Sequence, residues 1–377
     1  MAKVKHDSVI RVAQIMGKLS GGGVENVVFN YYREIDKTKI QFDFFYDADS
    51  IIEPPKNLRD MGANFYKLPP YQNTVKYVNA LKAYFDENNY LIVHSHLNSL
   101  SVIPLFVAKR SNIPVRIAHS HSVPGNNELI RDTAKNILKY FSRIYATDLF
   151  ACSEKAGRWL FGNRQYNSGK VKIIKNAVDF QKFRNLSEQK VAIQNKYELR
   201  GKFIIGHVGR LTFAKNHIFM LKILKKVLEK RKDAILILIG EGELRKQVTK
   251  KIRKMGLENN VLLLGYKEDP VAFYSVMDVL LLPSRFEGLS MTTIESQIAK
   301  VPAVVSTAVP KEAVISTGCR RLSLNDDISK WVDYLLEAPE ESVNLTKLGM
   351  EYDISRAAPQ LESFYEKKYK EFKRGIG

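Results

Sequence analysis

Short apolar runs alternate with amphipathic segments along the whole chain. In the N-terminal half this pattern predicts strands at 9–16 and 41–46, further strands beginning near residues 65, 91, 115, 149 and 171, and helices at 24–35, 75–87, 100–110, 127–143 and 154–161. In the C-terminal half it predicts strands at 203–208, 234–239 and 279–282, and helices at 188–199, 289–298 and 358–374. Because strands that alternate with helices are typical of parallel sheets, we expect an α/β fold with doubly wound sheets.

Length and composition are consistent with two packed domains. The chain has 377 residues, of which 45% are hydrophobic. No apolar run approaches the roughly 18 residues of a membrane-spanning helix, and residues 1–7 lack the apolar core of a signal peptide. Two cysteines, Cys152 and Cys319, are too few for a disulfide framework. We therefore expect a cytoplasmic protein.

Two glutamates, Glu287 and Glu295, lie where the apolar strand 279–282 runs into a helix. Gly288 permits a tight turn between the strand and the helix. A helix start offers unpaired backbone N–H groups and a partial positive charge, which suit an anionic or polyhydroxyl ligand such as a sugar nucleotide. From the spacing alone, two ordinary acids at a helix start and on a surface explain the pattern equally well.

A second loop, at 209–216, follows the strand 203–208. Its first residue, Gly209, lets the backbone turn close to a ligand. Arg210 and Lys215 then place two cations at the carboxyl end of the strand, where open parallel sheets bind their ligands. A planar guanidinium and an ammonium together suit a diphosphate. The loop alone would carry little weight, because cations in loops are usually just solvated.

Together the two segments resemble the retaining glycosyltransferases of family 4. Ser296 and Lys300 depart from the residues usual in that family, and we expect these departures to affect packing more than mechanism. The other motifs of the family follow in their usual order and spacing between residues 202 and 313: Gly-Arg-Leu at 209–211, Lys-Asn at 215–216, Gly-Glu-Gly-Glu-Leu at 240–244, Val-Leu-Leu-Leu-Gly-Tyr at 261–266, the two glutamates, and Val-Pro-Ala-Val-Val-Ser at 301–306.

The resemblance implies the GT-B fold, in which two Rossmann-like doubly wound domains face a central cleft. We expect an N-terminal acceptor-binding domain at 1–179 and a C-terminal nucleotide-sugar-binding domain at 180–357. A terminal helix at 358–377 would cross back onto the first domain. The resemblance also implies roles for the charged side chains: Arg210 and Lys215 would bind the diphosphate of the donor, Glu295 its ribose hydroxyls, and Glu287 the sugar near its reacting carbon.

Backbone groups near glycines would complete the donor site. By the resemblance, the N–H groups of Gly288 and Leu289 would assist the first glutamate. The glycine run at 21–23 has three readings. A dinucleotide fingerprint would need a glycine in place of Asn26, and a phosphate loop would need Lys-Ser or Lys-Thr where the helix opens with Val24. We prefer the reading implied by the resemblance, in which the backbone of Gly22 and Gly23 approaches the donor phosphate or the acceptor.

Two histidine pairs, His94 with His96 and His119 with His121, close strands of the N-terminal half. Imidazoles at strand ends could donate to sugar hydroxyls or to a departing phosphate. Similar enzymes keep one histidine near the donor sugar at the end of the strand 115–119. Either His119 or His121 could fill that place, and His121 is slightly favoured because it lies just beyond the strand. A zinc site is the rival hypothesis, disfavoured because no cysteine or acid stands nearby at ligand spacing.

Asp47 and Asp49 follow the strand 41–46 and resemble the metal-binding Asp-x-Asp of the other major glycosyltransferase fold. That fold has one domain with its motif near the middle, whereas the strongest motifs here lie in the second half. An aspartate pair after a strand is usually only a turn. We therefore predict no metal and no cofactor, with the nucleotide sugar as a co-substrate.

The formal net charge of +19 calls for an anionic partner. Arg131, Lys135, Lys139 and Arg143 recur at every fourth residue of the predicted helix 127–143, which places a basic stripe beside an apolar one. Such a helix suggests docking onto an anionic membrane surface, at the inner face of the cell membrane. A helix packed on the core with a solvated lysine face explains the same spacing.

The function implied by the resemblance is retaining glycosyl transfer from a nucleotide-diphosphate sugar, on family frequency a UDP-sugar, to a glycan or polyprenyl-linked acceptor in bacterial surface polysaccharide synthesis. A nucleotide-sugar epimerase of the same fold is an alternative, but no acid and base pair for it is evident. A nucleic-acid-binding protein would explain the charge, yet neither an aromatic platform nor a helix-turn-helix pattern is found. The missing third glycine disfavours a nicotinamide oxidoreductase.

Overall fold

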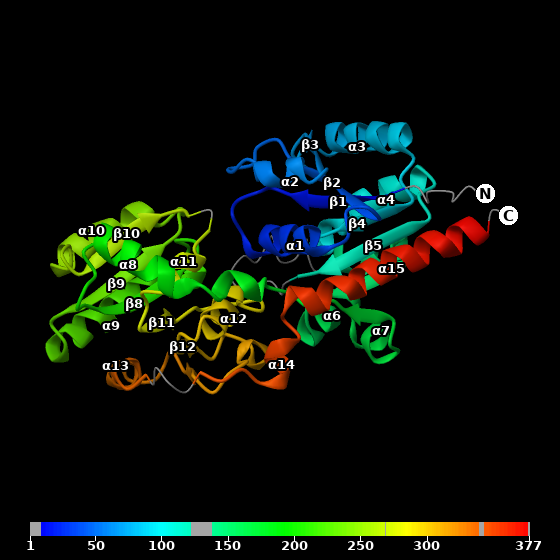
Figure 1. The fold of residues 1–377 in the computed structure, drawn as a ribbon. Coiled ribbons are helices and arrows are strands. Elements are labelled where there is room, and N and C mark those ends of the chain that lie inside the picture. The colour runs from blue at the N-terminus through cyan, green and yellow to red at the C-terminus, as the bar shows by residue number, and fades with distance from the viewer. Residues whose placement is uncertain (1–8, 122–137, 268, 339–342, 376–377) are drawn as a thin grey trace. The chain divides into compact units, whose positions relative to one another are not determined.

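The computed structural model describes residues 9–121, 138–267, 269–338 and 343–375. The chain divides into two compact units (Figure 1). Unit 1 comprises Met1–Val178 and Tyr352–Gly377, and unit 2 comprises Asp179–Glu351. Each unit contains a parallel sheet with helices packed on it, so the expected pair of doubly wound domains is confirmed.

Unit 1 is built on a seven-stranded sheet in the order β3-β2-β1-β4-β5-β6-β7. Its described strand pairs are all parallel, and the chain reverses its direction of winding between β1 and β4. The strands are β1 (Ile10–Gly17), β2 (Ile40–Asp47), β3 (Asn64–Leu68), β4 (Ile92–Ser95), β5 (Val115–Ser120), β6 (Asp148–Ala151) and β7 (Val171–Ile173).

Side-chain caps mark the starts of some helices of unit 1. The side chain of Asn73 caps the helix Thr74–Asn88, and that of Ser153 caps the helix Glu154–Phe161. Each accepts a backbone N–H group of its helix. Residues 138–145 are also helical, whereas Arg131 and Lys135 of the predicted basic stripe lie outside the described residues. The helices are α1 (Gly23–Glu34), α2 (Lys56–Asp60), α3 (Thr74–Asn88), η1 (Asn98–Ser101), α4 (Val102–Arg110), α6 (Glu154–Phe161), α7 (Asn163–Asn167) and α15 (Ile354–Arg374).

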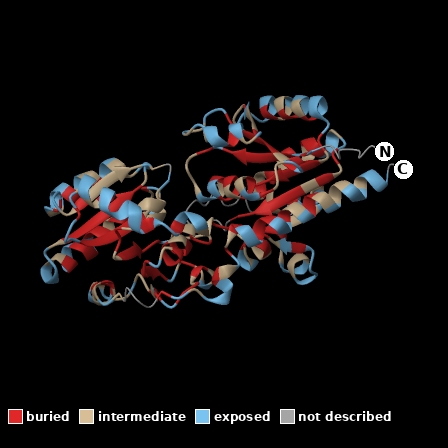
Figure 2. Cartoon of the chain, in the orientation of Figure 1, coloured by how far each residue is buried: buried red, intermediate tan, exposed pale blue. Residues whose placement is uncertain are grey.

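Unit 2 is built on a six-stranded parallel sheet in the order β10-β9-β8-β11-β12-β13. Its winding reverses between β8 and β11, which pair in parallel at Val279 and Ile205. The strand at 234–239 is buried along its whole length, as expected for a parallel strand covered on both faces (Figure 2). The strands are β8 (Phe203–Val208), β9 (Ala234–Ile239), β10 (Val261–Gly265), β11 (Val279–Leu282), β12 (Ala303–Ser306) and β13 (Cys319–Leu322).

Helix α12 of unit 2 begins later than the sequence suggested. The helix was expected from residue 289, but Ser290 adopts a left-handed conformation with φ of 65°, so the helix starts at Met291. The helices of unit 2 are η2 (Phe180–Phe183), α8 (Leu186–Lys196), η3 (Phe213–Lys215), α9 (His217–Lys230), α10 (Arg245–Met255), α11 (Val271–Tyr274), α12 (Met291–Ile298), η4 (Lys311–Ala313), α13 (Ile328–Leu336) and α14 (Lys347–Met350).

The C-terminal helix α15 belongs to unit 1, where it packs against α1 and β1. Its buried stripe includes Leu361, Phe364 and Tyr365, while the opposite side is exposed (Figure 2). The chain returns to unit 1 at Tyr352, earlier than the expected residue 358, because the backbone N–H of Ile354 donates to the carbonyl of Val178. Across the described residues, no helix combines the length and the apolar character that crossing a bilayer requires.

Candidate active site

The predicted site residues fall into two groups, one in each unit. In unit 2 they follow β8 and β11, the neighbouring strands between which the winding of the sheet reverses. Ligands of open parallel sheets bind at the carboxyl ends of strands at such a point. The topology therefore brings together two loops that are separated by more than sixty residues of sequence, 209–216 and 283–290.

Glycines allow the first loop to pack tightly on its neighbour. The backbone N–H of Gly209 donates to the carbonyl of Ile239, at 2.9 Å. A Cβ atom on Gly240 would lie 2.2 Å from the carbonyl oxygen of Gly209, a distance that no side chain can tolerate. Only glycine fits there, since its φ of 138° is also unfavourable for other residues. The loop that carries the two predicted cations is thus held by its backbone.

Lys215 and Glu287 form an ion pair at the centre of the site. The Nζ atom of Lys215 lies 2.6 Å from Oε1 of Glu287, and the two side chains are 19% and 8% exposed. The hydroxyl of Ser284 donates to the same carboxylate oxygen, also at 2.6 Å. The side chain predicted to bind phosphate, Lys215, and the one predicted to bind the sugar, Glu287, therefore neutralise each other. Both keep hydrogen-bonding capacity for a bound molecule.

Arg210 stands apart from this pair. Its side chain is exposed, and among the described residues its guanidinium makes no hydrogen bond or ion pair. A neighbouring cation, Arg285, is instead held in place: its guanidinium donates to Oδ1 of Asn216, at 3.0 Å, and lies over the ring of Phe213. Arg210 can therefore move to a bound anion without losing an existing contact.

Glu295 lies on α12 and pairs with a residue that the sequence did not single out. The hydroxyl of Tyr274 donates to Oε2 of Glu295 at 2.9 Å. Burial raises the pKa of this carboxyl group, while the hydrogen bond from Tyr274 lowers it. One carboxylate oxygen is thus fixed by the protein, and the other is available to accept a hydroxyl.

The backbone before α12 supplies unpaired donors. The N–H groups of Gly288 and Leu289 make no hydrogen bond within the described residues. They lie just before the first turn of the helix, because Ser290 turns the chain in its left-handed conformation. The hydroxyl of Thr292 donates to the carbonyl of Val208 at 3.1 Å, which ties the helix to the end of β8. These N–H groups keep the predicted capacity to bind an anion or a hydroxyl.

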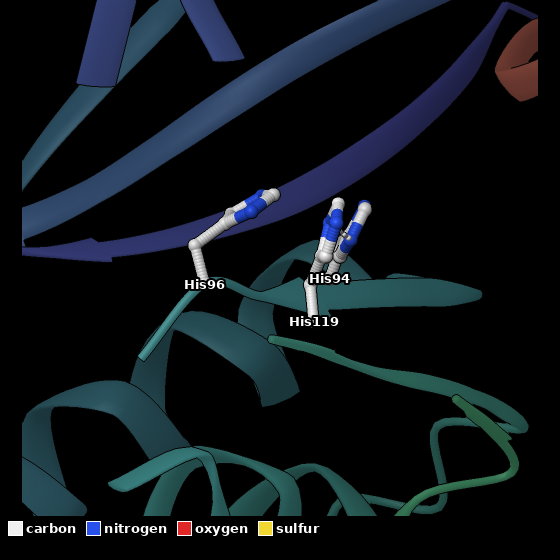
Figure 3. A group of neighbouring side chains, drawn as sticks. All are labelled: His94, His96 and His119. Atoms are coloured by element: carbon white, nitrogen blue, oxygen red, sulfur yellow. Dashed lines mark hydrogen bonds between the residues drawn. The ribbon is translucent and has the colours of Figure 1, made fainter. Parts of the chain in front are cut away.

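In unit 1, the two histidine pairs form one buried hydrogen-bonded chain. Nε2 of His94 lies 3.0 Å from Nδ1 of His119, and Nδ1 of His96 lies 2.8 Å from Nε2 of His121. Figure 3 shows the rings of His94 and His119 side by side, with that of His96 beside them. Both nitrogens of His121 are occupied, since Nδ1 contacts Asn176 at 3.2 Å. Of the ring nitrogens of these four histidines, only Nε2 of His119 has no partner among the described residues.

Two further side chains connect the contact between His94 and His119 to the contact between His96 and His121. The hydroxyl of Tyr365 on α15 lies 2.6 Å from Nδ1 of His94 and 3.3 Å from Nε2 of Gln14. The amide oxygen of Gln14 in turn lies 2.8 Å from Nε2 of His96. We call the set of Gln14, His94, His96, His119, His121, Asn176 and Tyr365 the histidine network.

The histidine network is uncharged. Burial lowers the pKa values of His94, His96 and His119 well below 6.5, with smaller contributions from neighbouring histidines. Burial also lowers the pKa of His121, to about 4, although the hydrogen bond to Asn176 opposes the shift. All four rings are therefore neutral near pH 7. Neither predicted catalytic histidine exposes its ring at the surface of unit 1.

The same cluster is the group most suited to a metal ion in the described part of the chain. Potential ligand atoms of His94, His96 and His119 lie within 4.8 Å of one another. Each short contact between two nitrogens, however, needs a proton between them, and a metal ion would displace it. No carboxylate joins the cluster to offset the charge of a divalent ion. The geometry thus favours a hydrogen-bonded network over a metal site.

Two other motifs are satisfied locally. The carboxylate of Glu25 accepts the backbone N–H of Ser20 at 2.8 Å, and a Cβ atom on Gly22 would lie 2.7 Å from Oε2 of Glu25. A carboxylate of the protein itself therefore lies beside Gly22, next to the predicted donor-binding backbone of Gly22 and Gly23. Asp49 pairs with Lys18, and burial raises the pKa of Asp47 to about 6.

Comparison with known proteins identifies the class. A family model described as glycosyl transferases group 1 matches residues 189–350, and one described as glycosyltransferase family 4 matches residues 21–182. With two Rossmann-like units and these matches over most of its length, the chain is a GT-B glycosyltransferase. It belongs to family 4, as the motifs of its C-terminal half predicted.

Individual relatives extend over much or nearly all of the chain. It is 28% identical to the putative glycosyltransferase EpsF of Bacillus subtilis, over 94% of this chain and 96% of that protein. The identity to the capsular polysaccharide biosynthesis glycosyltransferase CapM of Staphylococcus aureus is 27%, over 59% and 60%. It is 22% identical to the UDP-Gal:alpha-D-GlcNAc-diphosphoundecaprenol alpha-1,3-galactosyltransferase of Escherichia coli, over 68% of each chain.

Solved structures share the fold at lower identity. The crystal structure of Anabaena Alr3699/HepE in complex with UDP and glucose superposes with a TM-score of 0.78 and 15% identity, covering 95% of this chain and 99% of that one. At this identity the similarity establishes the fold alone.

Proposed function

We propose that this glycosyltransferase moves a sugar from a UDP-sugar to a lipid-linked glycan, with retention of the anomeric configuration, during assembly of a bacterial surface polysaccharide. The observation that carries the proposal is the meeting of Lys215 and Glu287 beside the unpaired N–H groups of Gly288 and Leu289, at the point where the sheet of unit 2 reverses. At such a point a cation suits the diphosphate of a nucleotide sugar, and an acid and backbone N–H donors suit its sugar.

Donor binding would exchange one set of contacts for another. The diphosphate carries negative charge that attracts the ammonium of Lys215 away from Glu287, and the released carboxylate can accept a hydroxyl of the sugar. Arg210 would add a second cation, because its guanidinium has no polar contact to give up within the described part of the chain. Glu295 would accept a ribose hydroxyl with the oxygen that Tyr274 leaves open.

The chemical step needs no nucleophile from the protein. The bond between the anomeric carbon and the diphosphate oxygen breaks, and the acceptor oxygen attacks from the same face. The acceptor proton passes to the departing diphosphate. Arg210, Lys215 and the backbone N–H groups would stabilise the charge that develops on the leaving group, so catalysis rests on positioning and electrostatics. Because these cations do what a divalent ion would do, activity should persist in EDTA.

The acceptor side of the proposal draws on the relatives. CapM is named for capsular polysaccharide biosynthesis, and the E. coli relative acts on a sugar linked to diphosphoundecaprenol. A lipid-linked acceptor would be met at the inner face of the cell membrane. In unit 1, the helix at 138–145 exposes Tyr140, Phe141 and Ile144 by 60%, 46% and 56%, next to Lys139 and Arg143. Exposed aromatic and basic residues on one helix suit an anionic lipid surface.

A thermal-shift screen against nucleotide sugars tests the donor assignment. We expect UDP and one UDP-sugar to raise the melting temperature, and NMR of the product made with that donor to show the anomeric configuration of the donor. Conversion of the donor without any acceptor would identify an epimerase instead. Salt-sensitive retention of DNA in a gel would point to nucleic-acid binding. Loss of activity in EDTA with recovery in Mn²⁺ would refute the metal-independent step.

Vesicle binding tests the membrane contact separately. The variant Phe141→Ser should reduce co-sedimentation with vesicles that contain phosphatidylglycerol, because it removes an exposed apolar anchor. Val191→Ser is the matched control, since Val191 of unit 2 is 52% exposed and belongs to another surface. Equal binding by both variants would exclude the helix at 138–145 as the contact.

A further inference from the structure

Buried imidazole nitrogens without partners lie beneath the loop that carries Lys215. Within the described residues, Nε2 of His207 and both ring nitrogens of His217 make no hydrogen bond. His207 is on β8, and His217 is the first residue of α9. Both side chains are almost fully buried. Because an unpaired buried polar atom is destabilising, these nitrogens call for an explanation.

The tautomer of His207 follows from its surroundings. Its Nδ1 atom lies 3.1 Å from the carbonyl oxygen of Leu281, which can only accept, so Nδ1 carries the proton. Nε2 therefore presents a lone pair. A Cβ atom on Gly209 would lie 3.1 Å from Nε2 of His207 and 3.2 Å from Cε of Lys215. Nε2 of His207 therefore faces the space beside Gly209. The lone pair and the end of the lysine chain are thus neighbours across a gap that glycine leaves open.

His217 holds the ring of His207 in this position. The two rings meet edge to face, with centroids 4.9 Å apart and an interplanar angle of 84°. Burial and, to a smaller extent, the charge of Lys215 lower the pKa of His217 to about 4. The backbone of Thr212 offsets this shift in part, although it makes no hydrogen bond of normal geometry with the ring. Burial likewise lowers the pKa of His207, so both rings are neutral.

We propose that His207 is a positioning residue for Lys215: its Nε2 accepts a hydrogen bond from the lysine ammonium once a diphosphate has drawn that ammonium away from Glu287. This inference rests on the proposed function, because it assumes that Lys215 binds the donor diphosphate. The three N–H donors of the ammonium then have separate partners, with the phosphate oxygens on one side and the imidazole lone pair on the other.

A neutral imidazole suits this task better than an acid would. Glu287 already pairs with Lys215, and a second carboxylate beneath the loop would compete with the phosphate for the ammonium. The lone pair of His207 directs the ammonium without neutralising it. This role explains why Nε2 of His207 has no partner among the described residues: its partner is the ammonium of Lys215 when a diphosphate is bound.

Two substitutions separate the nitrogens of His207. His207→Asn keeps a donor at the position of Nδ1 for the carbonyl of Leu281 and removes the acceptor that faces Lys215. His207→Gln keeps a polar group at the position of Nε2. Titration calorimetry with UDP should give about tenfold weaker binding for His207→Asn, the loss expected for one hydrogen bond to a charged group. His207→Gln should restore the affinity to within about twofold of that of the unmodified chain.

A double-mutant cycle with Lys215→Met shows whether the two residues act together. If His207 works through Lys215, His207→Asn weakens UDP binding only in the chain that retains the lysine. In the transfer reaction it should raise the KM of the donor more than it lowers kcat. Thermal unfolding of each variant without UDP shows whether the fold is retained.

The outcomes distinguish this inference from the proposed function. If Lys215→Met weakens UDP binding but His207→Asn has no effect, or has the same effect with and without the lysine, the positioning role is wrong and the donor site stands. If Lys215→Met leaves UDP binding unchanged, the phosphate assignment fails, and the inference about His207 fails with it.

Discussion

The two units use the same edge of a parallel sheet in opposite ways. In unit 1 the polar side chains at the ends of β4 and β5 include histidines that pair with one another and with Tyr365 of α15. In unit 2 the residues beyond β8 and β11 include Lys215 and Glu287, which are charged and partly exposed. Equivalent topology therefore creates a polar edge twice, and the depth of burial decides whether that edge becomes an internal network or a binding site.

The electrostatic reason for this difference is the cost of burying charge. The histidines of unit 1 are almost fully buried, so each is held in its neutral form. The ion pair of unit 2 retains contact with solvent and can therefore keep both charges. A charged ligand can exchange partners in unit 2, whereas in unit 1 any added proton must be buried.

The largest effect should come from the cations of unit 2. Lys215→Ala and Arg210→Ala should each lower kcat by about 10²-fold, since each removes one group that stabilises the leaving diphosphate. Lys222→Ala, a change of an exposed lysine on α9, is the control. Turnover is measured with the UDP-sugar found in the thermal-shift screen. Near-normal turnover in both variants would show that the loops after β8 and β11 do not bind the diphosphate.

Acid should destabilise the histidine network next. The pKa of His121 falls from 6.5 to about 4 on folding, so the unfolded chain binds more protons between these values. The contribution of this histidine to the free energy of unfolding is fully present above about pH 6.5. It is lost as the pH falls toward 4, by about 1.4 kcal/mol per pH unit for each such histidine. Calorimetric unfolding between pH 7 and 5 measures the loss. A melting temperature independent of pH in that range would contradict the buried network.

Removing the hydroxyl of Tyr365 should have a smaller effect, confined to unit 1. Tyr365→Phe leaves Nδ1 of His94 and Nε2 of Gln14 without this partner. The free energy of unfolding should fall by about 1–3 kcal/mol, the range for an unsatisfied buried polar group. Urea unfolding measures the change, and UDP titration is the control, because the donor contacts proposed for unit 2 are untouched. Weaker UDP binding by this variant would show that the histidine network of unit 1 also affects donor binding, against the comparison between the two units.

The smallest effect should come from Tyr274. Tyr274→Phe removes the hydrogen bond that fixes one oxygen of Glu295 but leaves the carboxylate itself. UDP affinity should fall by about fivefold, since one such hydrogen bond contributes roughly 1 kcal/mol. Glu295→Gln provides the comparison, because it alters the ribose ligand directly. If Tyr274→Phe weakened binding as much as Glu295→Gln, the tyrosine itself would be a ligand.

Much of the fold was predictable because its signals are local. The strands at 234–239 and 279–282 are short apolar runs, and both are buried strands at the expected residues. Helix α6 occupies the expected residues 154–161 because Ser153 caps its start and Gly162 follows its end. The first residue of α12 was missed by two positions, since nothing in the sequence marks Ser290 as left-handed.

The candidate site was predictable in part. Motif order pointed to Lys215 and Glu287, and the structure brings them into contact. Their roles in binding a donor stay predictions. No sequence motif pointed to Tyr274, because its contact with Glu295 depends on how α11 packs near α12. It also could not show that both nitrogens of His121 are taken by other side chains.

The sequence by itself determined the two doubly wound units and their order, since periodicity and turn residues act over a few neighbours. It also determined the family, through motifs whose spacing is fixed along the chain. Only the tertiary structure decided which polar strand ends are sealed and which are open. Burial depends on the elements that pack over a strand end, such as α15 over the histidines, and these can come from the far end of the chain.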